Sequence, residues 1–187
     1  RRIPHGKESG SGWEMRRRLF NIIEHSLAVA GGILIIYHLA FHVTVITSGS
    51  MQPTLCGTSK ENGDWVLTEC ITGRWREPKR FEVIAFVDEL GVSIMKRVIG
   101  LPGETVSMQE GVLMVDENPL SLPPFLQAVS YRNYGNLREG NPVSCGAGYY
   151  VLGDDSIDSL DSRFTGPILK DRLLGRAWVR IWPASRM

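Results

Sequence analysis

The sequence predicts a mainly β protein, in which one N-terminal transmembrane helix precedes an antiparallel, β-barrel-like domain. Two observations favour this fold class. One long apolar run stands near the N-terminus, and the rest of the 187 residues consists of short β-type runs separated by turn residues. A chain of this length holds one domain and an anchor more easily than two domains. We expect a basic tail over residues 1–25, the membrane helix over 26–47 and the β-rich domain over 48–187.

The apolar run extends from Leu27 to Ile46 and has no charged residue. As a helix it is about 30 Å long, which is close to the thickness of the hydrocarbon core of a bilayer. A cleaved secretory signal and a buried helix are the alternatives. A cleaved signal usually has a shorter apolar core followed by an A-x-A site. Here Thr47-Ser48-Gly49-Ser50 follows instead, so an uncleaved membrane anchor is the favoured interpretation.

The distribution of charge predicts the orientation of the anchor. Residues 1–25 hold six Lys or Arg against three Asp or Glu, with the compact cluster Arg16-Arg17-Arg18 just before the apolar run. Positive residues remain on the cytoplasmic side, which places residues 48–187 across the membrane. That domain holds fifteen basic against seventeen acidic residues. It lacks the basic balance of nucleic-acid binders, so membrane lipid is an expected partner and nucleic acid is not.

The domain is predicted to contain short strands bounded by turn residues such as Asn62-Gly63-Asp64. In order, the expected strands are Trp65–Ile71, Phe81–Val87, Val92–Ile99, the hairpin strands Glu104–Met108 and Val112–Val115, then Tyr149–Leu152 and Leu173–Trp182. Residues 118–147 are rich in Pro, Gly and Asn and are expected to form a long irregular excursion.

The positions of histidine exclude two kinds of site from the domain. The chain has four histidines, and all precede the β-rich domain: His5, His25, His38 and His42. A Ser-His-Asp triad or a histidine-based zinc site within residues 48–187 is therefore excluded. His38 and His42 are four apart and share a face of the predicted helix, but no third ligand accompanies them. We expect neither a metal nor a cofactor.

The three cysteines, Cys56, Cys70 and Cys145, form no CxxC motif. A Cys70–Cys145 disulfide in an oxidising compartment and three unpaired thiols both remain open, because sequence does not reveal geometry.

Lys96 is the candidate general base of a domain without histidine. Strand alternation places it on the same face as Val92, Ile94 and Val98. Desolvation on an apolar face lowers the pKa of an ammonium group, which a lysine base requires. A snorkelling lysine at the rim of the barrel fits the same spacing. The S-x-x-K pattern that starts at Ser93 is rejected, because it requires a helix and residues three apart on a strand point to opposite faces.

The segment Gly153–Arg163 contains four acids and three serines and resembles a calcium loop. It fails as an EF-hand, since it lacks the central glycine and has Thr165 at the twelfth position. A structural role fits better. In an extended segment Asp161 and Arg163 share a face and can pair, and Ser159 projects the same way, where it can hydrogen-bond an amine.

The segment Ser48–Leu55 is open to two interpretations. As a polar linker it joins the anchor to the domain. Alternatively, Gly49 permits a sharp turn between two serines and Pro53 stiffens the exit, so that a nucleophilic hydroxyl is presented at the edge of the membrane.

Taken in order, three segments resemble the signature segments of type I signal peptidases. They are SGSMQPTL at 48–55, KRVIGLPGE at 96–104 and GDDSIDSLDSR at 153–163. The resemblance implies that Ser50 is the nucleophile and Lys96 its general base. It also implies that the Ser48 hydroxyl and the Ser50 backbone N–H form the oxyanion hole.

The same resemblance assigns supporting and substrate-binding residues. Ser159 corresponds to the serine that orients the lysine amine, Asp161 and Arg163 to a supporting ion pair, and Gly153 to a close-packing glycine. The residues implied to line shallow pockets for small side chains are Ile46, Met51, Leu55, Ile94 and Met95.

Three positions depart from the family pattern. Thr47 stands where proline is common before the first serine, Asp155 replaces the usual asparagine, and Phe81-Glu82 replaces a Gly-Asp pair. None of them removes a group assigned to catalysis. Asp155 adds a negative charge near the expected site.

The function implied is that of a membrane-bound serine endopeptidase with a Ser–Lys dyad. It removes N-terminal signal peptides from secreted preproteins by cleavage after small residues, in an A-x-A pattern. The signal peptides of preproteins are therefore expected partners. We expect a single pass through the plasma membrane with the catalytic domain on the extracytoplasmic side. A bacterial membrane is favoured over an organellar one, because no transit-peptide-like extension is present.

Two other functions are alternatives to the peptidase. A self-cleaving repressor-type protease shares the Ser–Lys chemistry, but it lacks an anchor and carries a DNA-binding head, for which residues 1–25 are too short. A non-enzymatic, membrane-tethered β domain that binds partners needs no neutral lysine, so the pKa of Lys96 discriminates it from the peptidase.

Overall fold

The structure is a computed structural model that describes residues 10–71 and 76–183. It divides into two compact units at Ala40 and Phe41. The first nine residues of the predicted tail and part of the charged segment before Phe81 lie outside the described residues.

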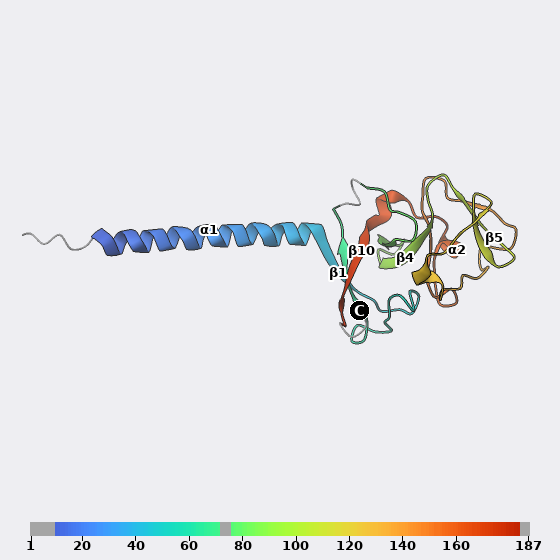
Figure 1. Ribbon diagram of the computed structural model, residues 1–187, viewed down its shortest axis with the longest axis horizontal. Coiled ribbons are helices and arrows are strands. Elements are labelled where there is room, and N and C mark those ends of the chain that lie inside the picture. The colour runs from blue at the N-terminus through green and yellow to red at the C-terminus, as the bar shows by residue number, and fades with distance from the viewer. Residues whose placement is uncertain (1–9, 72–75, 184–187) are drawn as a thin grey trace, which may run out of the picture. The chain divides into compact units, whose positions relative to one another are not determined.

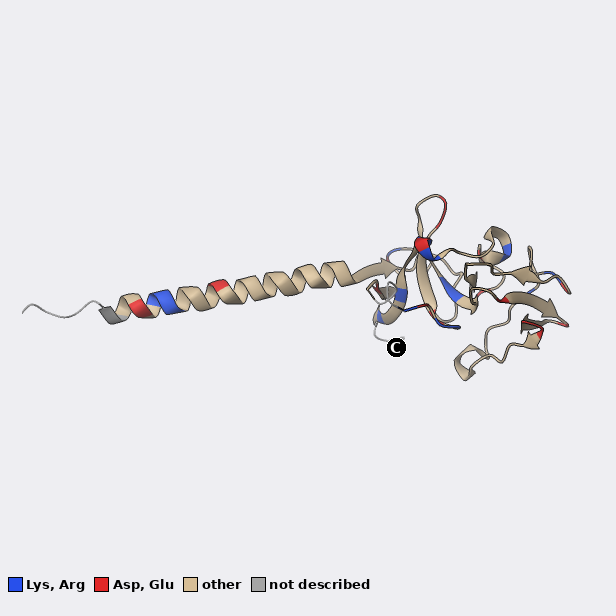
Figure 2. Ribbon diagram, turned by 90° about the horizontal axis from the view of Figure 1, so that it is seen from above, with Lys and Arg blue, Asp and Glu red and all other residues tan. Residues whose placement is uncertain are grey.

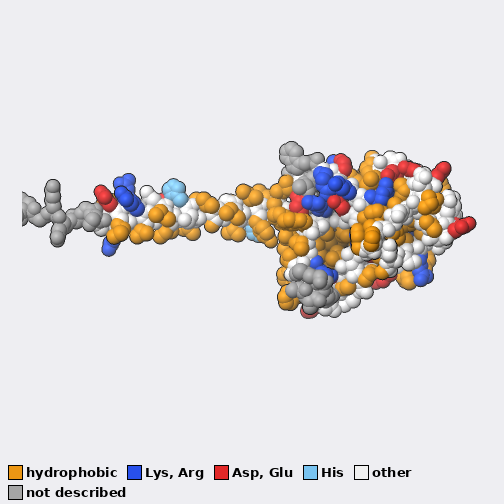
Figure 3. All heavy atoms as spheres, viewed as in Figure 1, with side chains coloured by type: hydrophobic (Ala, Val, Ile, Leu, Met, Phe, Trp, Pro, Cys, Tyr) orange, Lys and Arg blue, Asp and Glu red, His pale blue; other side chains and the backbone are white. Residues whose placement is uncertain are grey.

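The first unit consists of one helix, α1, which runs without interruption from Gly10 to Ala40 (Figure 1). Its charged residues lie in its N-terminal part (Figure 2). The remainder shows a mostly hydrophobic surface (Figure 3). Within the described residues this is the one helix long and apolar enough to cross a membrane.

The bounds of the helix differ from the prediction of 26–47. It begins earlier, because the segment from Gly10 to Glu24 continues the helix without Pro, and it ends at Ala40. Residues Phe41–Val45 form strand β1 instead. Three of these five residues are β-branched, which favours an extended chain, and they pair with a partner strand. His42 therefore lies on a strand, and the helix face that it was predicted to share with His38 does not exist.

The second unit contains two antiparallel sheets. The larger has six strands in the order β1-β2-β10-β3-β4-β9. Their bounds are β1 Phe41–Val45, β2 Trp65–Glu69, β10 Leu173–Trp182, β3 Val83–Val87, β4 Ser93–Gly100 and β9 Tyr150–Leu152. The mainly antiparallel β fold is confirmed. Both sheets are open in the described part of the chain, so the barrel-like shape is not a closed barrel.

The smaller sheet has four strands in the order β7-β6-β5-β8. Their bounds are β7 Asn118–Pro119, β6 Val112–Val115, β5 Thr105–Gln109 and β8 Val143–Ser144. The predicted hairpin is confirmed. Gln109 pairs with Val112, and the two residues between them, Glu110 and Gly111, have positive φ angles of 50° and 77°. This is the backbone that a tight hairpin turn requires.

Most of the excursion at 118–147 is irregular, as expected, and three short helices connect the remaining strands. They are η2 Pro124–Leu126, α2 Ser162–Thr165 and η3 Lys170–Arg172. All three cysteines are free, so the Cys70–Cys145 disulfide is not formed.

Three apolar clusters form the core of the second unit. One of them, which lies beneath the candidate site, joins β2, β3, β4 and the segment after β1. Its buried members are Ile46, Met51, Leu55, Val66, Ala85 and Met95. The segment Ser48–Leu55 is thus fixed to the sheet by its own apolar side chains.

Candidate active site

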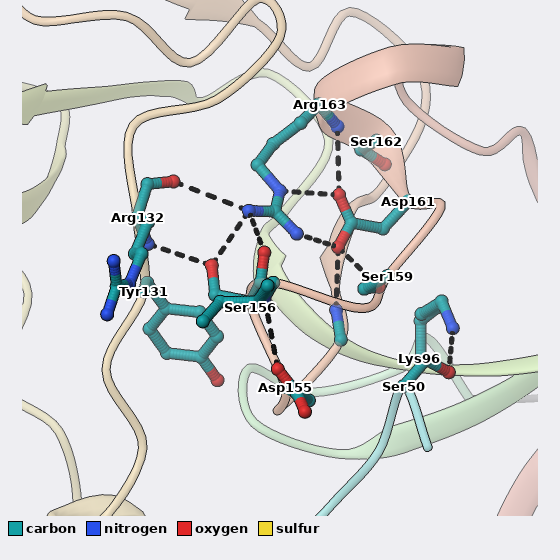
Figure 4. Close-up of polar contacts among 12 residues, drawn as sticks. Ser50, Lys96, Tyr131, Arg132, Asp155, Ser156, Ser159, Asp161, Ser162 and Arg163 are labelled. Carbon is teal, nitrogen blue, oxygen red and sulfur yellow. Dashed lines mark hydrogen bonds and ion pairs between the residues drawn. The ribbon is translucent and has the colours of Figure 1, made fainter. Parts of the chain in front are cut away.

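The side chains of Ser50 and Lys96 meet in a buried place. Lys96 lies on β4 and Ser50 in the turn that follows β1, and the Lys96 Nζ atom donates a hydrogen bond of 2.5 Å to Ser50 Oγ (Figure 4). The exposed fraction is 6% for Ser50 and 3% for Lys96. The structure therefore brings together the hydroxyl and the amine that the sequence singled out.

Burial alone does not distinguish Lys96 from its neighbour. From Met95 to Gly100 both faces of β4 are buried, and Arg97 is also only 3% exposed. Arg97 has a carboxylate partner, since its Nη2 lies 2.5 Å from Asp154 Oδ2. Within the described residues Lys96 forms no ion pair. Its amine therefore faces a hydroxyl without a counter-ion in contact.

The environment of Lys96 lowers its pKa to about 8, and burial of the ammonium is the main cause. The carboxylates of Asp161, Asp154 and Asp158 act in the opposite direction. The guanidinium of Arg163 adds to the lowering. A substantial fraction of the amine is consequently neutral near pH 8, as a general base must be.

Ser48 lies beside Ser50. Its Oγ is 3.2 Å from Ser50 Oγ, and the turn that contains Ser50 closes through a bond from the Gln52 N–H to the Gly49 carbonyl. An exposed hydroxyl this close to the reacting atom has a suitable position for a donor to an oxyanion.

The Asp161–Arg163 ion pair is present and fully enclosed, with both side chains at 0% exposure. It differs from the predicted extended arrangement, because Asp161 is the N-cap of the short helix α2 and Arg163 lies in its first turn. The guanidinium binds both carboxylate oxygens at 2.8 Å, and its Nη1 donates to Ser156 (Figure 4). The pair therefore holds the third signature segment in a fixed shape.

Ser159 points toward this ion pair. Its hydroxyl donates to Asp161 Oδ2 at 2.7 Å, and in the described part of the chain it has no hydrogen bond to Lys96. Sequence reasoning expected an amine as its partner. The carboxylate is the stronger acceptor within reach, and it also accepts the Gly153 N–H.

Gly153 allows the third segment to approach Ser50 closely. A Cβ atom at this position would lie 2.1 Å from Ser159 Oγ and 2.5 Å from the Ser50 carbonyl oxygen. No side chain fits there, so glycine is required by close packing.

A groove of about 220 Å³ leads to the dyad. One wall is formed by the segment from Thr44 to Ser48 and the other by the segment from Val92 to Lys96. Of the five predicted substrate-binding residues, the groove is lined by Ile46, Met51, Ile94 and Met95. Leu55 is the exception, because the turn bond from its N–H to the Met51 carbonyl directs it into the apolar cluster below.

A family model described as "Signal peptidase, peptidase S26" matches residues 18–182. The chain belongs to the signal peptidase S26 family.

The relatives of this protein include signal peptidases from cyanobacteria and Bacillus and processing peptidases from plants. The probable signal peptidase I-2 of Synechocystis sp. is 35% identical, over 76% of this chain and 63% of the relative. The signal peptidase I of Leptolyngbya laminosa is 34% identical, over 76% and 69%. The chloroplastic thylakoidal processing peptidase 1 of Arabidopsis thaliana is 30% identical, over 76% and 42%. The match thus spans less than two thirds of the Synechocystis relative and less than half of the Arabidopsis relative.

The sequence analysis did not predict the polar network around Asp154. Asp154 Oδ2 accepts hydrogen bonds from Arg97 at 2.5 Å and from the Thr54 hydroxyl at 2.5 Å. Tyr131 donates to Asp154 Oδ1 at 3.3 Å. Thr54, Arg97 and Asp154 come from the first, second and third signature segments. The available signal was a lone arginine beside the candidate lysine, on a strand otherwise rich in apolar residues.

Among the described residues, no group of three or more His, Cys, Asp or Glu side chains could hold a metal ion. In the third segment, Asp154 and Asp161 instead bind arginines, and Asp155 accepts backbone N–H groups.

Proposed function

We propose that this protein is a membrane-anchored serine endopeptidase that removes signal peptides from preproteins by a Ser–Lys dyad. The observation that carries the proposal is the 2.5 Å contact between Lys96 Nζ and Ser50 Oγ, in a buried place where the lysine has a pKa of about 8. Membership of the signal peptidase family favours this reaction over a repressor-type protease and over a non-enzymatic module.

The first half of the reaction is acylation. Neutral Lys96 accepts the proton of the Ser50 hydroxyl across their contact, and Ser50 Oγ attacks the scissile carbonyl carbon. The Ser48 hydroxyl, 3.2 Å from the nucleophile, donates to the oxyanion together with the Ser50 backbone N–H. The Lys96 ammonium then protonates the leaving amine, which becomes the new N-terminus of the cleaved preprotein.

Deacylation repeats these steps with water. Neutral Lys96 accepts a proton from the water molecule, which attacks the acyl-enzyme carbonyl and releases the signal peptide from Ser50. The enclosed Asp161–Arg163 pair is a positioning element that holds the loop around Ser159 and Gly153 against the dyad.

The groove supports a substrate in extended form with small side chains. Its walls are two strand-like segments, and its apolar lining comes from Ile46, Met51, Ile94 and Met95. An extended peptide between two such segments gains backbone hydrogen bonds, while shallow pockets select the residues near the scissile bond. This arrangement fits the A-x-A pattern of signal peptide cleavage sites.

The proposed location is a membrane, with one pass through α1 and residues 41–187 on the extracytoplasmic side. Support comes from the apolar helix and from Arg16-Arg17-Arg18 before it. Strands β1, β2 and β10 also expose large apolar side chains, among them two tryptophans on β10, which suit a lipid interface. These exposed residues are Val43, Trp65, Trp178, Val179, Ile181 and Trp182.

The test uses the detergent-solubilised full chain and a model preprotein with an A-x-A site. We expect Ser50→Ala, Lys96→Ala and Lys96→Arg each to lose at least about 10³-fold in cleavage rate, since none retains both a nucleophile and a base that can be neutral. Gel analysis and mass spectrometry of the products measure the rate and the cleavage position.

Lys79→Ala is the matched control, because Lys79 is exposed and lies outside the site. It is expected to cleave at the wild-type rate. Near-normal cleavage by Ser50→Ala or by Lys96→Ala would show that the dyad is wrongly assigned.

A further inference from the structure

Asp158 holds a carboxylate directly beside the nucleophile segment. Asp158 is exposed, and a Cβ atom built on Gly49 would lie 3.2 Å from its Oδ2 atom. Gly49 stands between the two serines of the site. The negative charge is therefore next to the backbone that presents Ser50.

The position of Asp158 is set by a short chain of hydrogen bonds. The Asp155 N–H donates to the Ser50 carbonyl at 3.1 Å. Asp155 Oδ1 in turn accepts the N–H groups of Ile157 at 3.0 Å and of Asp158 at 3.4 Å. This local turn ties the backbone of Asp158 to that of the nucleophile.

The carboxylate of Asp158 differs from those of Asp154 and Asp161 in its partners. Asp154 and Asp161 are each paired with an arginine. By contrast, among the described residues no side chain forms an ion pair with Asp158 or donates a hydrogen bond to its carboxylate. It acts on Lys96 only at longer range, where it is one of the charges that raise the lysine pKa. Its carboxylate is therefore available to a group that approaches from solvent.

The groove indicates which part of a substrate approaches Asp158. The groove is lined from Thr44 to Ser48 on one wall and from Val92 to Lys96 on the other, and the dyad stands at its Ser48 end. Gly49 and Asp158 are not part of the lining. If the residues before the scissile bond lie along these walls, the residues after it leave past Gly49 and the Asp158 carboxylate.

On the basis of the proposed function, we propose that Asp158 is a specificity-determining residue for the first residues after the scissile bond. It favours a cationic side chain there and disfavours an anionic one. Because the carboxylate is exposed, its effect is that of a solvated charge pair, roughly two- to five-fold in rate for each sign, and salt screens it.

The experiment compares three model preproteins that differ only in the residue after the scissile bond, which is Lys, Gln or Glu. The full chain in neutral detergent is assayed for kcat/KM at low salt and at about 0.5 M salt, where screening is strong. The wild type is expected to cleave in the order Lys, Gln, Glu. Its Lys-to-Glu ratio is expected to be roughly four- to twenty-five-fold at low salt, with a smaller ratio at high salt.

Substitution of Asp158 separates charge from structure. Asp158→Asn is expected to bring the Lys-to-Glu ratio close to one, Asp158→Lys to invert it and Asp158→Glu to retain it. The ratio is independent of any change in the pKa of Lys96, because all three substrates share the same base. Asp171→Asn removes an equal charge from an exposed position outside the site and is the matched control, with the wild-type ratio expected.

Each alternative outcome is distinct. Cleavage of none of the substrates by the wild type would refute the proposed function, and this inference with it. Equal wild-type rates for Lys and Glu substrates, or an unchanged ratio in Asp158→Asn, would overturn the role of Asp158 while the proposed function stands. An equal fall in all three rates in Asp158→Asn, with the ratio retained, would show that Asp158 only supports the loop.

Discussion

At the scale of single residues, Lys96 and Arg97 are adjacent, buried basic residues that have different polar partners. Asp154 lies in contact with Arg97, whereas Lys96 faces a hydroxyl. A guanidinium cannot lose its proton in a protein, so burial requires a carboxylate partner. An ammonium can lose its proton, and desolvation then produces a base. The same strand thus carries a structural cation and a candidate catalytic amine side by side.

The pKa of Lys96 predicts how activity depends on pH. With the pKa lowered to about 8, kcat/KM of the full chain is expected to fall about tenfold per pH unit below pH 8 and to level off above it. A pH series with one model preprotein measures this profile. A flat profile between pH 6 and pH 8 would contradict a lysine base.

Lys96→Met tests whether burial of the ammonium group causes the lowered pKa of Lys96. The folded-state pKa is below the unfolded value, so the penalty for burying the ammonium is complete below about pH 8 and disappears as the pH rises toward the unfolded pKa. The inactive Lys96→Met variant is therefore expected to have a free energy of unfolding higher than that of the wild type at pH 7, by on the order of 2 kcal/mol. Urea unfolding measures this difference. The difference is expected to shrink toward pH 10.

At the scale of elements, the three signature segments converge on the carboxylate of Asp154. Thr54 belongs to the turn after β1, Arg97 to β4 and Asp154 to the loop after β9, and all three side chains are joined by hydrogen bonds. A second enclosed pair, Asp161 with Arg163, stabilises the same loop. The geometry of the dyad therefore depends on buried polar contacts between elements as well as on the apolar cluster beneath it.

Asp154→Asn tests the importance of this convergence. The substitution leaves Arg97 buried without a counter-ion, and removal of one partner of a buried pair typically costs about 3–5 kcal/mol. Urea unfolding of the full chain in detergent, followed by tryptophan fluorescence, measures the loss. Glu77→Gln breaks the solvent-exposed pair with Lys170 and is expected to cost less than about 1 kcal/mol. Equal effects of the two substitutions would argue against the role given to Asp154.

At the scale of the whole molecule, the boundary between the two units lies at Ala40, seven residues before the predicted end of the anchor. Strand β1 belongs to the second unit, where it pairs with β2 along its whole length. Ile46 follows it into the apolar cluster, and its N–H donates to the Asp64 carbonyl. The segment that leaves the helix is therefore also a wall of the groove.

Two truncations distinguish this boundary from the predicted one. A chain that begins at Phe41 is expected to remain folded, to cleave a short A-x-A peptide and to bind membranes more weakly than the full chain, because only the apolar surface of β1, β2 and β10 remains. A chain that begins at Ser48 loses β1 and the burial of Ile46, which is worth about 1.5–3 kcal/mol, together with one wall of the groove. We expect at least a tenfold lower peptide cleavage rate from it. Circular dichroism, flotation with vesicles and a peptide assay measure the three properties, and equal behaviour of both chains would contradict the assignment of β1.

The sequence by itself predicted the fold class, the order of most strands, an apolar helix long enough to span a membrane, and the candidate pair Ser50 and Lys96. These features are local or are carried by recognisable residues. Periodicity predicts strands, twenty apolar residues predict a spanning helix, and the absence of histidine leaves lysine as the base. The resemblance to signal peptidases then distinguished Ser50 from Ser48, which spacing did not.

The tertiary structure alone decided which polar groups meet. Strand β1 was missed because its apolar, β-branched residues continue the pattern of the preceding helix, and only pairing with β2 makes them extended. The burial of Leu55 and the position of the Asp158 carboxylate beside Gly49 depend on contacts between segments far apart in the chain. The partner of Ser159 is only two residues away, but it depends on the turn into α2. Sequence spacing constrains neighbours within a few residues, whereas these contacts arise from the packing of turns against the sheet.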